Sequence, residues 1–234
     1  MSALLNVAGL NAWYGESHIL HGVDLHVNEG EMICILGRNG MGKTTTLRSI
    51  MGILRKRTGT ITFAGSDMMT MPLHRSARAG LGFVPEERGI FASLSVQENL
   101  MLPPVVAKGG MSVDEIYALF PNLHARRNSP GTKLSGGEQQ MLAMARILRT
   151  GARCLLLDEP MAGMGLEDVR TVAGIIRDVA RDRAVLMVEH NLSVVADICD
   201  RVTVLQRGEI LASGDYATVS TDPRVRTAYM GTDA

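Results

Sequence analysis

Two patterns of hydrophobic and polar residues alternate along the chain. Between residues 4 and 27, apolar side chains recur at about every second position, as at Val23, Leu25 and Val27, which is typical of half-buried antiparallel strands. The run over residues 32–36 is instead continuously apolar and ends at a glycine, which indicates a strand buried on both faces of a parallel sheet. We therefore expect an opening antiparallel β-layer followed by a parallel sheet.

Short apolar runs predict further buried strands along the chain. These are residues 81–84, 154–157, 184–188 and 202–205. The segments between them have helical length and period, beginning with residues 43–51 directly after the first buried strand. Regular alternation of strands and helices predicts an α/β fold with a parallel sheet.

The buried-strand pattern disappears between residues 86 and 150. Helices are expected there instead, broken by proline and glycine residues. They cover residues 96–101, 112–120 and 137–149. We therefore predict a single domain over residues 1–234, with a core formed by residues 1–85 and 151–234 and an inserted helical subdomain at 86–150. Residues 222–229 are expected to form a short capped helix.

Composition narrows the class of protein. The 234 residues are 46% hydrophobic and 21% charged, which is typical of a globular domain rather than a disordered or fibrous chain. Twenty-four basic residues balance 24 acidic ones, so no net field attracts nucleic acid. The sequence lacks a long apolar run and a leader pattern, which predicts a cytoplasmic protein. Cys34, Cys154 and Cys199 have no paired spacing, and we expect thiols rather than disulfides or metal ligands.

The strongest chemical motif lies at residues 37–44, which read Gly-Arg-Asn-Gly-Met-Gly-Lys-Thr. They match G-x-x-x-x-G-K-[ST] between a buried strand and a helix, the context this phosphate-binding loop requires and one that a chance glycine-rich turn lacks. The glycines allow backbone N–H groups to surround a phosphate, Lys43 neutralises its charge, and the Thr44 hydroxyl suits Mg²⁺. The predicted nucleotide-binding residues here are Gly37, Arg38, Asn39, Gly40, Met41, Gly42, Lys43, Thr44 and Thr45.

Two adjacent acids, Asp158 and Glu159, end the apolar run that begins at residue 154. Ligands bind at this end of the strands in open α/β sheets. Asp158 suits Mg²⁺ coordination through water, and Glu159 suits a general base that polarises the attacking water. An Asp-Glu-Pro sequence by itself is also common as a turn that ends a strand.

A second helix start that suits an anion is predicted at Ser135, Gly136 and Gly137, within the sequence Leu-Ser-Gly-Gly-Glu-Gln-Gln. The plain alternative is a helix cap. One phosphate-binding loop already binds a complete triphosphate, so a second anion-binding helix start requires a different ligand. The γ-phosphate bound by a neighbouring subunit would supply one.

Taken together, the loop at residues 37–44, LSGGEQQ, LLLDEP and Val188-Glu189-His190 resemble the nucleotide-binding subunit of an ABC transporter over essentially the whole chain. In that family two subunits enclose two ATP molecules, each between the phosphate-binding loop of one subunit and the signature sequence of the other. The resemblance implies ATP and Mg²⁺ as ligands and ATP hydrolysis. It also implies a second ATP-binding subunit, transmembrane permease subunits and a place on the inner face of the cell membrane.

The same resemblance assigns further residues. Tyr14 corresponds to the aromatic residue that stacks on adenine, with Trp13 as the alternative, and His190 to the switch histidine that contacts the γ-phosphate. Glu86 stands where most of the family has a glutamine that touches Mg²⁺, so we expect it near the metal. The loop at residues 161–166 lacks the Asp or Asn that usually contacts the other subunit.

Longer strings narrow the resemblance. GRNGMGKTT, VPEERGIF, LSGGEQQMLAMAR and DPRVRTAYMG are similar to the ATPases of branched-chain amino-acid importers and their urea and amide relatives, which implies a separate substrate-binding protein. Residues 161–164 and 188–191 resemble the companion ATPase of those systems, so the choice between the two subunits stays open. Residues 86–102 are the predicted docking surface for a membrane partner.

Other functions remain as alternatives. A lipopolysaccharide or lipid exporter uses an ATPase of similar size and tail. A soluble ABC ATPase without a permease usually carries two cassettes or a long coiled coil, and this chain has one phosphate-binding loop and no sustained heptads. A nucleotide kinase or GTPase needs no LSGGEQQ sequence, and no N-K-x-D string is present.

Overall fold

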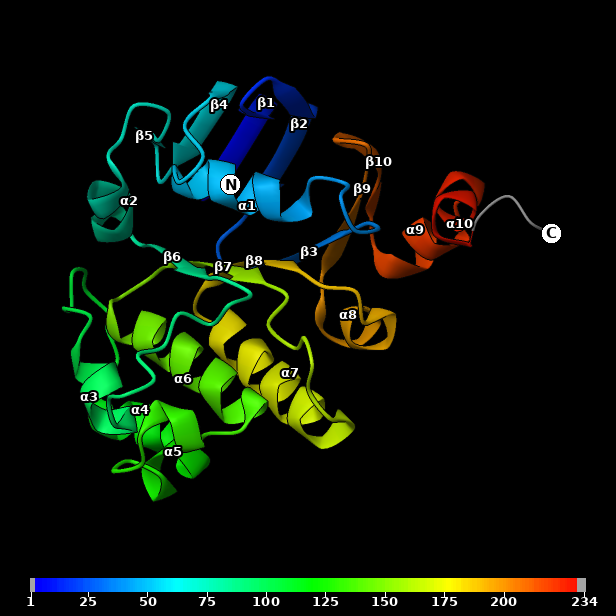
Figure 1. Ribbon diagram of the computed structural model, residues 1–234. Helices are drawn as coiled ribbons and strands as arrows, with labels where there is room; N and C mark the ends of the chain where they lie inside the picture. The colour runs from blue at the N-terminus through cyan, green and yellow to red at the C-terminus, as the bar shows by residue number, and fades with distance from the viewer. Residues whose placement is uncertain (1–2, 231–234) are drawn as a thin grey trace.

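The computed structural model describes residues 3–230, which fold around a six-stranded sheet (Figure 1). Its strand order is β10-β9-β3-β8-β7-β6. All neighbouring pairs are parallel except β9 and β10. The strands are β3 (Met32–Leu36), β6 (Leu81–Val84), β7 (Cys154–Asp158), β8 (Ala184–Val188), β9 (Arg201–Gln206) and β10 (Glu209–Gly214). The predicted parallel sheet is confirmed, and β10 is an additional strand.

The central strands are buried on both faces. Every residue of β3, β7 and β8 is buried, as their continuous apolar runs predict. Alternate side chains enter two different hydrophobic cores: Ile33 and Ile35 face one, whereas Cys34 and Leu36 face the other. The two cores therefore share the same strands.

The opening β-layer is confirmed as a second, antiparallel sheet with the order β2-β1-β4-β5. Its strands are β1 (Leu5–Tyr14), β2 (Ser17–Val27), β4 (Arg57–Phe63) and β5 (Ser66–Asp67). A bulge lies where β1 passes β4. There Gly59 has φ +108°, and a Cβ on it would lie 2.5 Å from the carbonyl oxygen of Gly9, so the two backbones approach closely because this residue is glycine.

Helix α1 (Lys43–Met51) packs between the two sheets (Figure 1). Its residues Leu47 and Ile50 join the core formed with the antiparallel sheet. On the opposite face of the six-stranded sheet lie α6 (Gly136–Arg149) and α7 (Leu166–Ala180). Helix α2 (Leu73–Ala79) leads into β6. The result is a layered α/β domain, as predicted.

Residues 86–150, all of them described, contain helices and no strand beyond one isolated bridge between Ser95 and Pro130. Besides α6 these helices are α3 (Val96–Met101), α4 (Val113–Leu119), α5 (Pro121–Ala125) and the 3₁₀ turn η1 (Gly131–Lys133). Helices α3, α4 and α6 each begin with a serine cap and a glutamate three residues further on. This capping box satisfies free backbone N–H groups at a helix start. The predicted helices in this segment are confirmed to within a residue or two.

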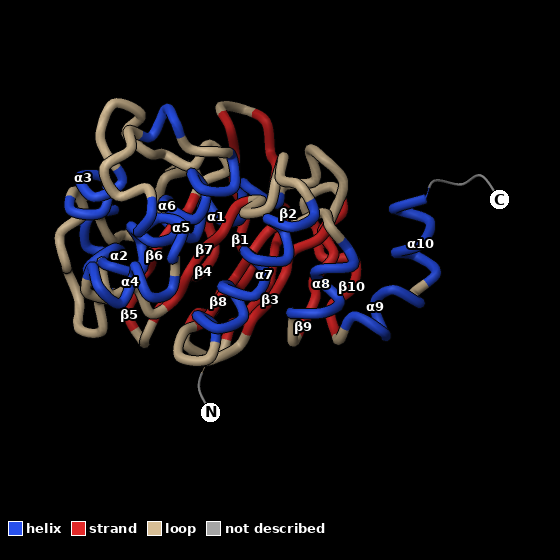
Figure 2. Tube along the Cα trace, turned by 90° about the horizontal axis from the view of Figure 1, so that it is seen from below, coloured by secondary structure: helices blue, strands red, loops and turns tan. Residues whose placement is uncertain are grey.

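The chain ends with α8 (Leu192–Ile198), α9 (Tyr216–Thr221) and α10 (Pro223–Met230). Figure 2 shows α9 and α10 extending beyond the β9–β10 side of the sheet. The predicted tail helix is α10, preceded by Asp222, which accepts the Arg224 N–H at 2.8 Å; α9 was not expected. All three cysteines are free thiols in the structure, and Cys34 and Cys154 are buried within strands, as their apolar runs predict. Among residues 3–230, no helix combines the length and apolar character needed to cross a membrane.

Candidate active site

The phosphate-binding loop connects β3 to α1 and leaves the helix start open. Gly42, at the N-cap of α1, has φ +103° and supplies no side-chain hydrogen bond to the helix. A Cβ on Gly37 would lie 2.5 Å from the carbonyl oxygen of Leu205, so the loop can approach β9 only because this residue is glycine. The first N–H groups of α1 and the helix dipole therefore face outward, where an anion can bind them.

Lys43 lies at a cavity of about 380 Å³. The lysine side chain is buried, and its Nζ donates to the carbonyl oxygen of Arg38 at 3.3 Å. The cavity is lined by residues from β1, β2, the phosphate-binding loop, α1 and the ends of β6 and β7. They are Tyr14, Ile19, Asn39, Gly40, Gly42, Lys43, Thr44, Thr45, Glu86 and Glu159. Residues predicted for one nucleotide site thus come together from distant parts of the sequence.

Three residues of the loop face elsewhere. Gly37, Arg38 and Met41 line a different cavity, beside the turn between β9 and β10. Their role toward a nucleotide stays a prediction.

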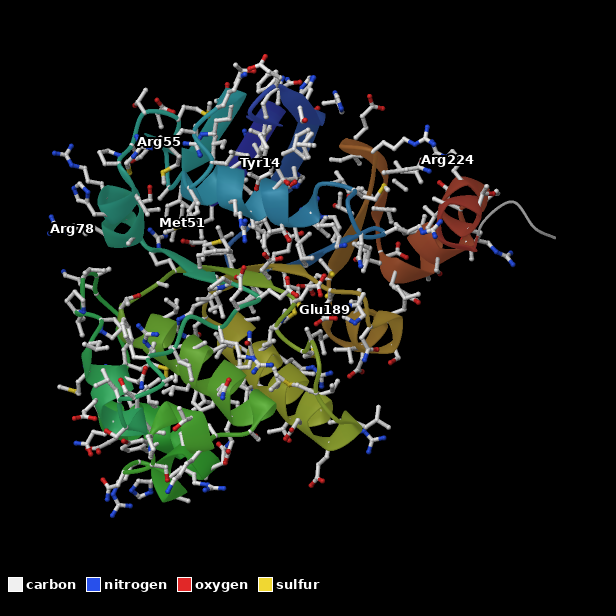
Figure 3. All side chains as sticks on the ribbon, viewed as in Figure 1. Tyr14, Met51, Arg55, Arg78, Glu189 and Arg224 are labelled. Atoms are coloured by element: carbon white, nitrogen blue, oxygen red, sulfur yellow. The ribbon has the colours of Figure 1, made fainter. Side chains whose placement is uncertain are left out.

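The two aromatic candidates differ in their surroundings. Tyr14 is 43% exposed and lines the cavity beside Lys43. Trp13 instead stacks on His18, with ring centroids 4.3 Å apart. Figure 3 shows Tyr14 on the same side of the central sheet as α1. Its position fits a base-stacking role, and that role stays a prediction.

Thr44 and Asp158 form the candidate magnesium site. The Thr44 hydroxyl donates to Asp158 Oδ1 at 2.9 Å, whereas Asp158 Oδ2 is buried without a partner. Burial raises the pKa of Asp158 to about 6, and the negative charges of Glu159 and Glu86 add to this effect while Thr44 and Arg48 oppose it. An unpartnered buried carboxylate oxygen beside a hydroxyl fits a hard divalent cation such as Mg²⁺.

No cluster of three or more His, Cys, Asp or Glu side chains within residues 3–230 is arranged to hold a metal without other ligands. Mg²⁺ usually keeps several waters and takes substrate phosphates as ligands. Glu86 lies at the same cavity, and its coordination of the metal stays a prediction.

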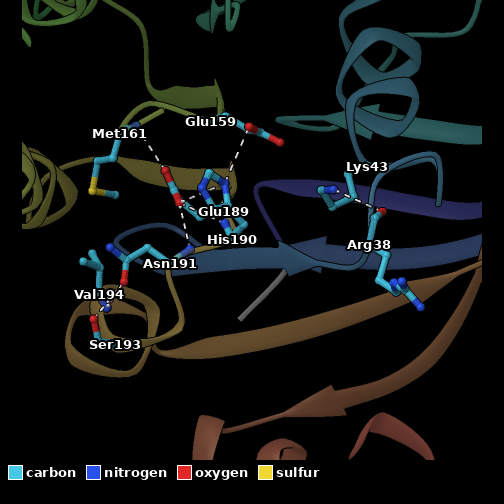
Figure 4. Close-up of polar contacts among 9 residues, drawn as sticks. All are labelled: Arg38, Lys43, Glu159, Met161, Glu189, His190, Asn191, Ser193 and Val194. Carbon is cyan, nitrogen blue, oxygen red and sulfur yellow. Dashed lines mark hydrogen bonds and ion pairs between the residues drawn. The ribbon is translucent and has the colours of Figure 1, made fainter. Parts of the chain in front are cut away.

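Glu159 is held in an unusual backbone conformation. Its φ is +49°, in the left-handed region that a residue with a side chain rarely adopts. Its N–H donates to the carbonyl oxygen of Val188 at 2.9 Å, and its own carbonyl oxygen accepts the Ala162 N–H at 3.1 Å. The side chain reaches the cavity, and Oε2 lies 3.6 Å from Nδ1 of the exposed His190 (Figure 4). Strained backbone of this kind often positions functional groups.

Glu189 is the residue that the sequence analysis passed over. It is completely buried, and its carboxylate accepts three backbone N–H groups. Oε1 accepts from Met161 at 3.1 Å, and Oε2 accepts from His190 at 2.9 Å and from Asn191 at 3.1 Å (Figure 4). The available signal was an acid directly after a buried strand, the same placement that identified Glu159 after β7.

The signature sequence forms a separate feature. Ser135 caps α6: its hydroxyl accepts the Glu138 N–H at 3.1 Å, and Glu138 accepts the Ser135 N–H at 2.8 Å. Neither Ser135 nor Gly136 nor Gly137 lines the cavity beside Lys43. The structure therefore does not bring the signature sequence to the phosphate-binding loop of the same chain.

Comparisons with known proteins identify the family. A family model described as "ABC transporter" matches residues 20–162. A second, described as "Branched-chain amino acid ATP-binding cassette transporter", matches residues 209–234, of which 231–234 lie outside the described residues.

Curated relatives match along nearly their whole length. The lipopolysaccharide export system ATP-binding protein LptB of Haemophilus influenzae is 35% identical, with 98% of each chain covered. The high-affinity branched-chain amino acid transport ATP-binding protein BraG of Pseudomonas aeruginosa is 34% identical, covering 97% of this chain and all of its own. The fold matches a nucleotide-free ATP-binding cassette from an ABC transporter with a TM-score of 0.87 at 23% identity, covering 98% of this chain and 100% of the other.

Proposed function

The chain belongs to the ATP-binding subunits of ABC transporters, a family that hydrolyses ATP, and from this premise we propose that it energises a membrane importer. The solute class we propose is branched-chain amino acids or related small amides. One observation supports the catalytic part of this proposal. A single cavity is lined by Lys43, Thr44, Glu86, Glu159 and Tyr14. Beside this cavity, Asp158 Oδ1 accepts a hydrogen bond from the Thr44 hydroxyl.

Each group has a role that its surroundings allow. The open N–H groups of α1 and the Lys43 ammonium bind the β- and γ-phosphates, and Tyr14 stacks on adenine. Thr44 and Asp158 hold Mg²⁺, which neutralises charge on the phosphates when bound. Glu159 accepts a proton from the attacking water, and His190, 3.6 Å from Glu159, orients that water beside the γ-phosphate.

The separate position of the signature sequence supports a composite site. Ser135, Gly136 and Gly137 lie outside the cavity of their own chain, so we propose that they bind the γ-phosphate held by a second ATP-binding subunit. Two chains then enclose each nucleotide, and hydrolysis separates them.

The proposed partners are transmembrane permease subunits on the inner face of the cell membrane, with a substrate-binding protein on the other side. Residues 86–102 are the proposed docking surface, and its exposed apolar side chains support this: Phe91 is 50% exposed, Met101 57% and Leu102 47%. Val96, in the same segment, is fully buried and belongs to the core.

The proposed solute rests on two of the comparisons. The C-terminal family model describes a branched-chain amino acid transporter, and BraG is a relative along the whole chain. A lipopolysaccharide or lipid exporter is the second candidate, favoured by the equally similar LptB.

The catalytic proposal is tested by Glu159→Gln in the purified chain. The amide keeps the shape of the side chain but cannot accept the proton, so we expect kcat to fall by roughly 10²–10⁴ while ATP binding is retained. Glu167→Gln, a change at an exposed acid on α7, is the matched control and should keep full activity. Normal turnover by Glu159→Gln would overturn the assignment of the base.

The transport proposal is tested by purifying the tagged chain from gently solubilised membranes, with and without ATP, and identifying the proteins that accompany it. Two permeases and a second ATPase, encoded beside a substrate-binding protein, would support the importer. Permeases without such a binding protein would favour the exporter. Recovery of the chain without any integral membrane protein would overturn the transport role.

A further inference from the structure

Glu189 occupies an unusual place for a carboxylate. The Glu189 side chain is completely buried. A basic group, Nδ1 of the exposed His190 ring, lies 3.9 Å from its Oε2. Burying a carboxylate is unfavourable unless hydrogen bonds replace its water. Here three backbone N–H groups do so, at 2.9–3.1 Å.

The three N–H groups belong to two different loops. Met161 begins the loop at residues 161–166, two positions after Glu159. Glu189, His190 and Asn191 form the loop between β8 and α8, so the bonds to His190 and Asn191 lie within the carboxylate's own loop. Glu189 Oε1 binds the first loop and Oε2 binds the second (Figure 4). One carboxylate therefore joins the backbone next to the candidate base to the backbone of the candidate switch histidine.

A side chain must meet strict conditions to make this connection. An apolar residue has no acceptor, and an amide has one acceptor oxygen for two loops that both present N–H donors. The ladder between β7 and β8, in which Asp158 pairs with Val188, fixes the strand ends. Beyond those ends, Glu189 is the side chain seen to bridge the two loops.

We propose that Glu189 is a positioning residue for ATP hydrolysis, fixing the spacing between Glu159 and His190 and transmitting displacements of the loop at residues 161–166 to His190. This rests on the proposed function, because it assigns the chemistry to Glu159 and His190. The family resemblance places the loop at 161–166 next to the second subunit, although the loop lacks the Asp or Asn that usually makes this contact. A contact made there would move His190 through Glu189.

The first test is Glu189→Gln in the full-length chain. The amide nitrogen would face an N–H donor, so one loop loses its bond while the phosphate-binding loop keeps every contact. We expect kcat to fall about tenfold or more and KM for ATP to stay within about twofold, because geometry rather than binding is disturbed. Unchanged kcat in a folded variant would overturn the proposal.

Glu31→Gln is the matched control. Glu31 also accepts a backbone N–H, from Asn28 at 2.7 Å, but it precedes β3 at the end opposite the phosphate-binding loop. We expect this variant to keep its kcat. A loss of kcat equal to that of Glu189→Gln would show a general response to removing an acid and would overturn the specific role.

A double-mutant cycle separates positioning from support of the fold. His190→Ala removes the imidazole and keeps the backbone N–H that binds Glu189. If Glu189 acts through His190, Glu189→Gln lowers kcat much less in the His190→Ala background than in the original chain. Equal factors in both backgrounds would overturn the proposal.

Hydrogen exchange tests the connection without any substitution. On addition of a non-hydrolysable ATP analogue, amides in 161–166 and in 190–192 should change protection together. Independent changes would overturn the connection. A failure of the proposed function looks different: the unmodified chain would not hydrolyse ATP, or Glu159→Gln would hydrolyse it normally. If the Glu189 proposal alone fails, the unmodified chain still hydrolyses ATP and Glu159→Gln still loses that activity.

Discussion

The starts of α1 and α6 show two ways of preparing a helix end for an anion. At α1 the N-cap is Gly42, no side chain caps the helix, and no acid lies in the first turn. At α6 the N-cap is Ser135, which forms a capping box with Glu138. Both starts are rich in glycine, but only at α6 do side chains accept backbone N–H groups at the helix start, those of Ser135 and Glu138.

This difference indicates that the two helix starts act at different steps. The α1 start binds the nucleotide, and the α6 start completes a site in which the nucleotide is already bound. A glycine at the N-cap in place of a side-chain cap costs only a few tenths of a kcal/mol of stability, which a bound phosphate offsets at α1. The α6 start pays no such cost, carries the acid Glu138 in its first turn and faces no cavity beside Lys43. The α6 start is therefore suited to contact a phosphate that is already bound by the α1 start of another subunit. Substitutions at the two starts should therefore fail at different steps.

The largest effect on ATP affinity is expected from Lys43→Ala. The ammonium is the buried cation at the cavity, and its bond to Arg38 at 3.3 Å is a weak one that a phosphate can replace. Losing it should weaken ATP binding by about 2–3 kcal/mol, roughly 30- to 150-fold, and hydrolysis with it. Titration with a fluorescent ATP analogue measures this, with the exposed Lys108→Ala as control. If Lys43→Ala bound ATP as tightly as the parent chain, the assignment of nucleotide binding to the α1 start would be wrong.

Ser135→Ala should leave ATP binding unchanged, whereas Lys43→Ala weakens it. We expect unchanged ATP affinity in the single chain, at least a tenfold loss of turnover, and about 1 kcal/mol lower stability from the lost cap. Calorimetry and steady-state hydrolysis measure the two effects. In a homodimer, mixing the Ser135→Ala and Lys43→Ala proteins restores part of the activity, because one of the two sites is then intact. Absence of recovery would contradict a site shared between two copies of this chain.

Asp158→Asn should stabilise the nucleotide-free chain. The pKa of Asp158 is raised from 3.8 to about 6 by burial and then by neighbouring acids, so the folded state resists ionisation. Its contribution to the free energy of unfolding is fully present below pH 4 and is lost as pH rises through about 6. We expect the variant to exceed the parent by on the order of 1–3 kcal/mol at pH 7.5 and to match it near pH 4. Denaturant melts at both pH values measure the difference; a constant difference would contradict this assignment.

Glu86→Gln should give the smallest effect. Glu86 lies at the cavity and contributes to the raised pKa of Asp158, so removing its charge weakens the attraction for a cation. We expect hydrolysis to persist and the half-saturating Mg²⁺ concentration to rise by roughly two- to fivefold, about 0.4–1 kcal/mol. Titrations with Mg²⁺ and Mn²⁺ test this. Identical titrations for both proteins would rule out a part for Glu86 in the metal site.

Local patterns predicted much of this fold. The apolar run at residues 32–36 became β3, residues 184–188 became β8, and the first helix was placed at 43–51, as in the structure. Runs of this kind are informative because burial on both faces leaves no polar position in a strand. The phosphate-binding loop was found for a similar reason, since its spacing is fixed by local backbone geometry.

Other features depend on distant contacts and leave little trace in the sequence. The pairing of β1 with β4 joins residues about fifty positions apart, and the order of strands in the six-stranded sheet follows from packing. The sequence shows Glu189 directly after a buried strand, but it does not show the bond to Met161, which is 28 positions away and contributes a backbone N–H, a group that every residue but proline possesses. No side-chain pattern announces such a partner.

The shared strands have a consequence for how the molecule melts. Because β3 sends Ile33 and Ile35 into one core and Cys34 and Leu36 into the other, losing either core exposes one face of the same strand. The two halves should therefore unfold in a single cooperative transition. The helical residues that line the cavity beside Lys43 all belong to α1, yet the binding energy of a nucleotide there should raise the melting temperature of the whole domain, α6 and α7 included.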